Sequence, residues 1–248
     1  MEQKMQPSSL KIICLNIEFD RHLDRIIPFL KTQEADIILL QEVLVKDIPA
    51  LESTLKMKSV STLVNSMQRN GVSQSSAIVT FSALPILSSY SAYYRGEKDH
   101  LRLIHEHDEP ETVAEKTARA ILVTEVMKNG HLYRSINTHF TWSPKGQPTE
   151  RQHQDLDILF KLLSPLPDFI LCGDFNAPRG TAIFDAIASR YKDNIPQDVT
   201  TTIDKTLHRA GDLQLVVDGL FSTPGYQIES VKLFDKLSDH WAIVAQVK

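Results

Sequence analysis

The sequence contains few cysteines and no run of residues apolar enough to cross a membrane. Cys14 and Cys172 are the only cysteines among 248 residues, and both stand in apolar runs that are typical of buried strands. Such cysteines predict buried thiols and exclude the disulfide framework of a small secreted domain. The longest apolar runs, such as residues 35–40, fall far short of the roughly 20 residues that a transmembrane helix needs.

The sequence also lacks a large excess of charge of either sign. It has 27 Lys and Arg against 31 Asp and Glu, a net charge of −4, and no polybasic tail. This balance excludes a broad surface for non-specific nucleic-acid binding, but it does not exclude an enzyme that holds phosphate through a metal. Residues 1–9 are polar and lack the apolar stretch of a signal peptide. We therefore expect an intracellular, cytoplasmic protein without membrane insertion, and we predict no protein partner.

The composition is that of an ordinary globular protein. Hydrophobic residues make up 42% of the chain and charged residues 23%, and a chain of this length can bury a sizeable core. No tandem repeat, low-complexity stretch or linker interrupts the pattern. We therefore expect one domain over residues 1–248.

Hydrophobic periodicity predicts more strands than helices. Strands are expected at residues 10–17, 35–41, 60–67, 75–81, 86–94, 118–127, 131–140, 169–172, 215–222, 227–234 and 241–247. Helices are expected at residues 21–32, 47–56, 149–163 and 181–190. Asn129-Gly130 is a strong hairpin signal between two of the strands. Residues 95–116 and 197–211 are polar and are predicted to be long loops. The pattern indicates an α/β fold with two mixed, mostly antiparallel sheets packed face to face and helices outside.

Polar residues capable of chemistry stand at the ends of several predicted strands. They are Asn16, Glu42, His139, Asp174, Asn176, Asp218, Asp239 and His240. Each has a structural explanation when taken alone, since Asn and Gly-Asp sequences are common in turns. Asp218 is unusual because it stands between apolar residues, where a buried charge needs a partner, and a histidine would serve. Because strand ends converge at one edge of a sandwich, these groups could share one cleft.

In their order along the chain, these residues resemble the motifs of the endonuclease/exonuclease/phosphatase superfamily, the DNase I-like metal-dependent phosphoesterases. The matching motifs are Leu15-Asn16-Ile17, Gln41-Glu42-Val43, Asn137-Thr138-His139-Phe140, Gly173-Asp174-Phe175-Asn176, Val217-Asp218-Gly219-Leu220-Phe221 and Ser238-Asp239-His240-Trp241. The resemblance covers nearly the whole chain. It implies a four-layered α/β sandwich, in agreement with the predicted strands, and an enzyme that hydrolyses phosphoric esters.

The resemblance implies a metal site at Glu42, with Asn16 and Asp239 completing or supporting it. A hard carboxylate oxygen suits Mg²⁺, which retains several waters and takes one or two protein carboxylates. Mn²⁺ is expected to substitute for Mg²⁺. Zinc is disfavoured because the site has no cluster of Cys and His ligands.

The resemblance also implies catalytic roles around the phosphate. His240 would act as general base or hydrogen-bond the scissile phosphate, and Asp218 would orient its ring. Asp174 is the competing candidate for positioning or deprotonating the attacking water. Asn176 would hold a phosphate oxygen and help align Asp174, and His139 would stabilise the developing charge. The sequence leaves the division of base duty between Asp174 and His240 open.

Two further residues are candidates for substrate binding. Arg119 lies in a strand that commonly carries a basic residue facing the site in this family, although a surface arginine is the alternative. Trp142 lies near the expected site and could stack on a base or an aromatic leaving group.

The substrate class is less clearly indicated than the family. Glu18-Phe19-Asp20 departs from the abasic-site endonuclease branch, and Ala177-Pro178 departs from the inositol-polyphosphate phosphatase and tyrosyl-DNA phosphodiesterase branches. Gly173–Pro178 is similar to sphingomyelinase-like, deadenylase-like and small unassigned members. We expect a Mg²⁺-dependent phosphodiesterase that hydrolyses nucleic acid or a nucleic-acid adduct. The alternative is a phosphatase or phosphodiesterase acting on a phospholipid or small phosphate ester, and the remote alternative is a catalytically silent binding module.

Overall fold

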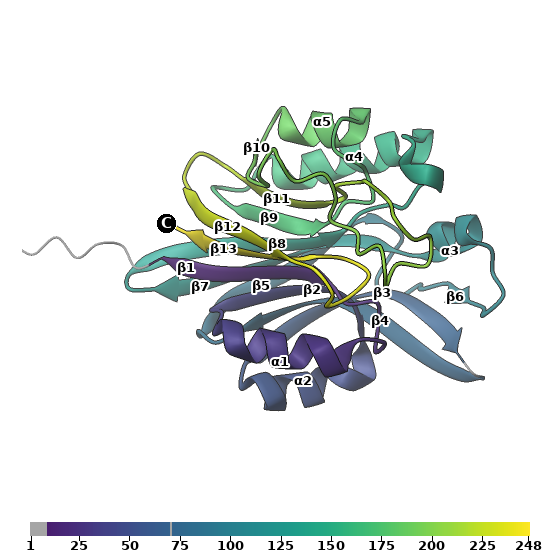
Figure 1. Cartoon of the computed structure of the whole chain (residues 1–248), viewed down its shortest axis with the longest axis horizontal. Helices are drawn as coiled ribbons and strands as arrows, with labels where there is room; N and C mark the ends of the chain where they lie inside the picture. The colour runs from purple at the N-terminus through teal and green to yellow at the C-terminus, as the bar shows by residue number, and fades with distance from the viewer. Residues whose placement is uncertain (1–8, 70) are drawn as a thin grey trace, which may run out of the picture.

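The computed structural model describes residues 9–69 and 71–248, which form an α/β sandwich of two mixed sheets (Figure 1). The sheets contain seven and six strands and pack face to face between outer helices. The predicted fold class is therefore confirmed. Residues 1–8, which supply most of the polar segment behind the expectation of no signal peptide, lie outside the described residues.

The first sheet has the strand order β12-β13-β1-β2-β4-β3-β6. Its strands are β1 (Leu10–Asn16), β2 (Ile37–Leu44), β3 (Lys58–Arg69), β4 (Val72–Ser82), β6 (Leu103–Ile104), β12 (Ile228–Phe234) and β13 (Ala242–Val247). β1 pairs parallel with β2 and antiparallel with β13. The first and last long strands of the chain are thereby neighbours in the middle of this sheet.

The second sheet has the order β10-β11-β9-β8-β7-β5. Its strands are β5 (Ile86–Arg95), β7 (Arg119–Lys128), β8 (His131–His139), β9 (Ile170–Asp174), β10 (Lys192–Asp193) and β11 (Asp218–Ser222). β8 and β9 are parallel, and the other pairs are antiparallel. Asn129 and Gly130 both have positive φ, +50° and +81°, which a tight hairpin turn requires. The predicted hairpin between β7 and β8 is confirmed.

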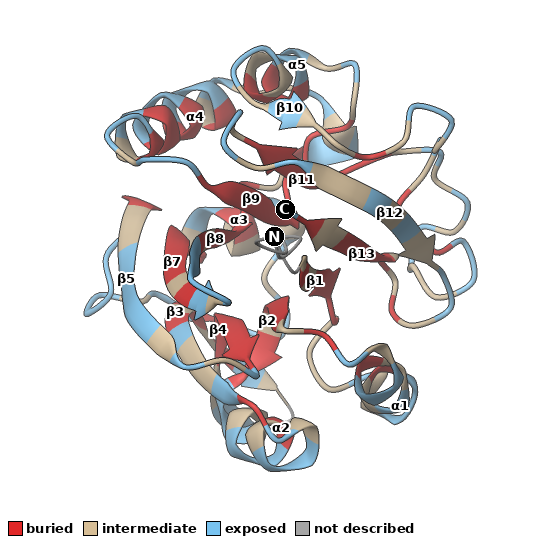
Figure 2. Ribbon diagram, turned by 90° about the vertical axis from the view of Figure 1, so that its left-hand side faces the viewer, coloured by how far each residue is buried: buried red, intermediate tan, exposed pale blue. Residues whose placement is uncertain are grey.

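Helices cover the outer face of each sheet (Figure 2). They are α1 (Leu23–Gln33), α2 (Ile48–Leu55), α3 (Pro110–Lys116), α4 (Glu150–Leu163) and α5 (Ala182–Ala188), with two short 3-10 turns, η1 (Val45–Asp47) and η2 (Pro144–Gly146). α1 and α2 lie over the first sheet, and α4 and α5 over the second. Thr149 caps α4, since its side chain accepts a hydrogen bond from the Gln152 N–H. None of the helices in the described residues has the length and apolar character needed to span a bilayer.

The space between the sheets is filled by apolar side chains from both. Cys14 of β1 and Cys172 of β9 belong to this core, and both are buried and free, as predicted from their apolar surroundings. Outer cores under the helices complete the four layers. The strands that carry the polar residues are therefore held on both faces, which favours a rigid site at their ends.

The structure differs from the predicted elements at several points. β2 continues to Leu44 instead of ending at residue 41, and the strand predicted to begin at residue 215 begins at Asp218. The predicted loop 95–116 contains α3, which starts with Pro110 in its first turn. Proline lacks the N–H that a first turn leaves unpaired, so it can begin a helix. The helix is only 7 residues long, too short for a clear periodic pattern.

Candidate active site

The alternation of side chains along the strands brings the polar groups to one edge between the sheets. Along β1, Cys14 faces the inner core and Asn16, two residues later, faces the same way at the end of the strand. Along β9, Cys172 and Asp174 repeat this arrangement. β11 begins at Asp218, which pairs directly with Asp174. Strand ends from both sheets therefore meet at one site.

Glu42 reaches this site because β2 contains a bulge. The register between β2 and β4 shifts between Leu40 and Val43, and Glu42 has a left-handed φ of +57°. A bulge breaks the alternation of side chains and commonly aims one of them near an active site. Gln41 and Glu42 both reach residues of the second sheet, although regular alternation would place them on opposite faces. The prediction that Glu42 follows the strand is thus corrected: it lies inside β2.

Gly173 allows β8 and β9 to approach closely. A Cβ at this position would lie 1.9 Å from the carbonyl oxygen of Thr138. No other residue type fits beside that oxygen without moving a strand. The close approach pairs His139 with Asp174 at the ends of the two parallel strands.

Asp174 is the centre of the cluster. Its Oδ2 atom lies 3.2 Å from Asn16 Nδ2, 3.4 Å from His139 Nε2 and 3.7 Å from His240 Nε2. Its Oδ1 atom accepts a hydrogen bond from the Asn176 backbone N–H at 2.8 Å. Donors from four separate segments therefore converge on one buried carboxylate, as the sequence predicted for strand ends that meet.

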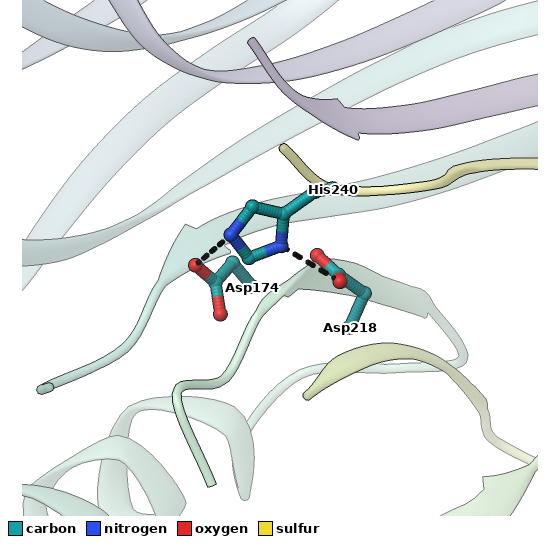
Figure 3. A group of neighbouring side chains, drawn as sticks. All are labelled: Asp174, Asp218 and His240. Atoms are coloured by element: carbon teal, nitrogen blue, oxygen red, sulfur yellow. Dashed lines mark hydrogen bonds and ion pairs between the residues drawn. The ribbon is translucent and has the colours of Figure 1, made fainter. Parts of the chain in front are cut away.

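His240 lies between two carboxylates (Figure 3). Its Nδ1 is 2.9 Å from Asp218 Oδ2, and its Nε2 faces Asp174. The predicted partnership of Asp218 with a histidine is present in the structure. The ligand atoms of these three residues lie within 4.8 Å of one another, a spacing that a metal could use. The short bond from His240 to Asp218 already occupies two of those atoms, so the trio acts as a hydrogen-bonded unit.

The carboxylates govern the charge of the buried ring. Burial disfavours the charged imidazole, but the Asp218 and Asp174 carboxylates outweigh this and raise the pKa of His240 well above its ordinary value. Burial also disfavours ionisation of Asp174, yet His240, His139 and the Asn176 N–H together lower the pKa of Asp174. These contacts favour the ionised form of Asp174 and the protonated, hydrogen-bond-donating form of His240.

Glu42 and Asp239 supply the oxygen atoms that a hard cation needs. Burial raises the pKa of Glu42, and the nearby Asp239 and Asp174 carboxylates raise it further while His139 opposes them. Across residues 9–69 and 71–248, no Lys or Arg forms an ion pair with Glu42, and His139 Nε2 lies 4.0 Å away. An uncompensated pair of carboxylates fits a divalent cation. The donor set of this site therefore fits a hard divalent cation.

Asn16 holds the two halves of the site together. Its Nδ2 donates to Asp174 and lies 3.4 Å from Glu42 Oε1, while its Oδ1 accepts from the Glu18 N–H. The Asn16 amide thus contacts both the Asp174 and the Glu42 carboxylates, and its part in a metal site stays a prediction. Asp239 is oriented by Ser238, whose hydroxyl donates to Asp239 Oδ1 at 3.0 Å.

Arg119 is buried beside the cluster, with 4% of its surface exposed. Its Nη1 donates to the carbonyl oxygen of His139 at 3.2 Å, and its buried Nε has no hydrogen-bond partner among the described residues. Burial lowers the pKa of Arg119, while nearby Tyr94, Asp174 and Glu42 oppose this effect. The alternative of a surface arginine is wrong.

Asn176 and Trp142 lie in the two segments that follow β9 and β8. Asn176 has a left-handed φ of +49°, and its Nδ2 donates to the Phe140 carbonyl oxygen at 3.1 Å. It therefore ties the two segments together and aligns Asp174 through its N–H. Trp142 is half-buried and, within the described part of the chain, makes no hydrogen bond or ring contact with the cluster. Its substrate-binding role stays a prediction.

The sequence did not point to the buried polar residues that connect the two sheets next to the site. Gln41 Nε2 donates to Asn137 Oδ1 at 2.7 Å across the two sheets, and Asn137 Nδ2 donates to the carbonyl oxygens of Leu40 and Val79. Both residues stand in the quoted motifs beside Glu42 and His139. Their signal was a polar side chain at an inward-facing position of a buried strand.

The sequence profile of the Endonuclease/Exonuclease/phosphatase family matches residues 13–240. The chain belongs to this family. It is therefore a phosphoesterase of the endonuclease/exonuclease/phosphatase type. The matched region begins in β1 and ends at His240, so it contains the cluster around Asp174. A comparison with curated proteins found no match.

Solved structures share this fold at low sequence identity. The endonuclease/exonuclease/phosphatase from Bacteroides vulgatus has a TM-score of 0.72 and 17% identity, covering 97% of this chain and 99% of that one. A mannosyl-6-phosphatase from Bacteroides thetaiotaomicron has a TM-score of 0.68 and 13% identity, covering 97% and 100%. ANGEL2, a 2′,3′-cyclic phosphatase, has a TM-score of 0.70 and 13% identity, covering 97% and 95%. At these identities the likeness shows the fold alone.

Proposed function

We propose that this family member is a Mg²⁺-dependent phosphodiesterase that hydrolyses nucleic acid or a nucleic-acid adduct. The observation that carries the proposal is the convergence of Asn16, His139 and His240 on Asp174, beside the Glu42 carboxylate. Hydrolysis of a phosphodiester needs donors for the phosphate oxygens and an acceptor for the proton of the attacking water. The cluster offers both within a few ångströms.

Asp174 is the acceptor that the geometry favours. Its Oδ1 is held by the Asn176 N–H, and its Oδ2 faces the space between the two histidines. In the proposed reaction a water oxygen forms a bond to phosphorus, its proton passes to Asp174, and the bond from phosphorus to the leaving oxygen breaks. His240 Nε2 and His139 Nε2 donate to the phosphate oxygens, and Asp218 holds the His240 ring in place.

Glu42 and Asp239 would hold the Mg²⁺, with Asn16 orienting Glu42. When bound, the ion neutralises charge on the phosphate oxygens and the leaving oxygen. Mn²⁺ has the same preference for oxygen ligands and should replace it. Arg119 donates a hydrogen bond to the carbonyl oxygen of His139, and its positive charge would lie close to the phosphate.

Cations and an aromatic ring near the site support nucleic acid as the substrate. Lys46 follows Glu42 by four residues and is half-exposed, and the side chain of Arg69 lies over the Phe19 ring. Cationic groups bind the backbone phosphates of nucleic acids, while aromatic rings such as Trp142 stack on bases. These groups would bind nucleotides next to the scissile bond.

A smaller phosphate ester is the second candidate, because these cations are already paired. Asp20 accepts from both Lys46 and Arg69, at 3.1 and 2.9 Å. A neutralised rim suits a substrate with one phosphate better than a polyanion. The fold neighbour described as a mannosyl-6-phosphatase fits this candidate.

A cleavage assay with Mg²⁺ tests the proposal. The first substrate is a labelled duplex with a 5′-phosphotyrosyl end and one internal abasic site, because the product length identifies the bond that is cut. Parallel reactions contain phosphoinositide or sphingomyelin vesicles and a sugar 6-phosphate. Cleavage of the duplex that EDTA abolishes supports the nucleic-acid proposal. Hydrolysis confined to a lipid or sugar phosphate overturns it in favour of the second candidate.

His240→Ala is the matched catalytic control. We expect it to lower turnover by a factor of roughly 10² to 10⁴, the usual contribution of an acid–base residue, while the circular dichroism spectrum stays native. Turnover near that of the wild type would remove His240 from the mechanism. A chain that binds no Mg²⁺ and cleaves none of the substrates would instead be a silent binding module.

A further inference from the structure

Thr202 is fully buried in a segment that the sequence predicted to be an irregular loop. Residues 202–204 lie against the residues that precede β13. Ile203 forms an antiparallel bridge with His240, the Trp241 N–H donates to Thr202 O at 2.7 Å, and the Asp204 N–H donates to Asp239 O at 2.8 Å. The backbone on both sides of His240 is therefore fixed by this segment.

The side chain of Thr202 contacts the start of β11, which carries Asp218, the partner of His240. Its Oγ1 accepts hydrogen bonds from the backbone N–H groups of Val217 and Asp218, each at 3.1 Å. The Thr202 N–H donates to Leu215 O at 3.0 Å. One residue thus connects the start of β11, which carries Asp218, with the segment that carries His240.

We propose that Thr202 is a positioning residue that holds Asp218 where its Oδ2 can accept from His240 Nδ1. The contact between His240 and Asp218 is 2.9 Å and buried. The Thr202 hydroxyl holds the backbone N–H of Asp218, while the Thr202 carbonyl oxygen holds the Trp241 N–H next to His240. This inference rests on the proposed function only for its effect on turnover.

Thr202→Val and Thr202→Ser separate the hydroxyl from the shape of the side chain. Valine has the shape of threonine without the hydroxyl, whereas serine keeps the hydroxyl. We expect Thr202→Val to lower kcat by about 10- to 100-fold, the usual effect of losing a group that orients an active residue, with little change in KM. Thr202→Ser should restore most of the rate. Thr200→Val is the matched control, since Thr200 is exposed and bonds only Gln214 among the described residues.

A double-mutant cycle with Asp218→Asn tests whether Thr202 acts through Asp218. If it does, Thr202→Val lowers kcat much less in the Asp218→Asn background than in the wild type, because residues that act as a unit are not additive. Equal losses in both backgrounds would assign Thr202 a general structural role and overturn the inference.

The imidazole resonances of His240 supply a readout that needs no substrate. The proton that His240 Nδ1 shares with a buried carboxylate should resonate downfield and exchange slowly with water, and its loss in His240→Ala assigns it. We expect Thr202→Val to shift or broaden this resonance, and Thr202→Ser and Thr200→Val to preserve it. An unchanged resonance in Thr202→Val overturns the inference. A wild type that hydrolyses no phosphate ester overturns the proposed function, while this resonance still decides the role of Thr202.

Discussion

Two residues of the site hold left-handed backbone conformations that glycine usually adopts. Glu42 has φ +57° and Asn176 has φ +49°. For a glutamate this conformation costs on the order of 1–3 kcal/mol, and it persists only where the surroundings enforce it. The bulge of β2 enforces it at Glu42, and hydrogen bonds to Asp174 and Phe140 enforce it at Asn176. The strain is thus located at Glu42, whose carboxylate faces the site, and at Asn176, whose N–H holds Asp174.

Glu42→Gln should weaken metal binding and slow turnover together. The change keeps the shape of the side chain but removes the charge that faces a cation. We expect the Mg²⁺ concentration for half-maximal rate to rise at least about tenfold, because Mg²⁺ is held by only one or two carboxylates. Isothermal titration with Mg²⁺ and rate measurements across Mg²⁺ concentrations test this.

Glu106→Gln is the control for this change, since Glu106 is exposed in the segment between β6 and α3. It should leave the metal response unaltered. If Glu42→Gln also left the response unaltered, Glu42 would not be a ligand of the metal.

At the scale of elements, the approach of β8 to β9 depends on one glycine. Gly173→Ala would place a methyl group 1.9 Å from the Thr138 carbonyl oxygen. We expect a loss of stability of about 3 kcal/mol or more, because the strands must separate to admit the methyl group. Chemical denaturation monitored by fluorescence measures the change in the free energy of unfolding.

Gly71→Ala separates this clash from backbone strain. Gly71 has φ +73° and open space around it, so alanine there meets only the conformational penalty, roughly 1 kcal/mol. Equal losses at both positions would show that contact with Thr138 does not determine the stability of the β8–β9 pair.

Helix α4 supports the site through Gln152. Its buried Nε2 donates to the carbonyl oxygens of Thr141 at 2.8 Å and Asn176 at 3.3 Å, so it connects the segments after β8 and β9. Gln152→Leu should lower kcat by about 10- to 100-fold, because Asn176 would no longer align Asp174. Steady-state kinetics measures the effect. Gln154→Leu, on the exposed face of the same helix, should leave kcat near that of the wild type, and equal effects of the two changes would contradict this role of Gln152.

At the scale of the whole molecule, a polar contact links the two sheets directly behind the site. Asn137 of the second sheet makes hydrogen bonds to Gln41, Leu40 and Val79 of the first. Asn137→Ala leaves several buried groups unpaired, and each such group costs about 1–3 kcal/mol. We therefore expect the free energy of unfolding to fall by roughly 2–4 kcal/mol.

A double-mutant cycle with Gln41→Ala measures the contribution of the link itself. The coupling should be favourable by about 1 kcal/mol or more, the range found for residues in one hydrogen-bond network. Additive losses would show that the two amides contribute independently of each other.

The order of the polar motifs allowed much of the site to be predicted. Asn16, His139 and Asp174 stand at or just after the ends of strands that apolar runs predict, so their common edge could be expected. The pairing of Asp218 with a histidine also follows, because a charge between apolar residues needs a partner. These inferences depend on local periodicity and on the cost of an unpaired buried charge, both of which short stretches of sequence reveal.

The direction of Glu42 and the role of Thr202 could not be predicted in this way. Regular alternation places Glu42 opposite Gln41, and only the pairing of β2 with β4 creates the bulge that turns it. Thr202 lies in a polar segment without periodicity, and its partners Asp218 and Trp241 stand far along the chain. A short segment of sequence does not reveal a hydrogen bond to a residue that lies far away along the chain.

The sequence by itself determined the family, the layered α/β architecture and the set of residues that can do chemistry, because these depend on residue type and local spacing. How that chemistry is arranged depends on the tertiary structure: which side chains surround Asp174, which nitrogen of His240 faces it, and which residues hold them in place. Such features depend on distances between segments that only the packing of two sheets brings together.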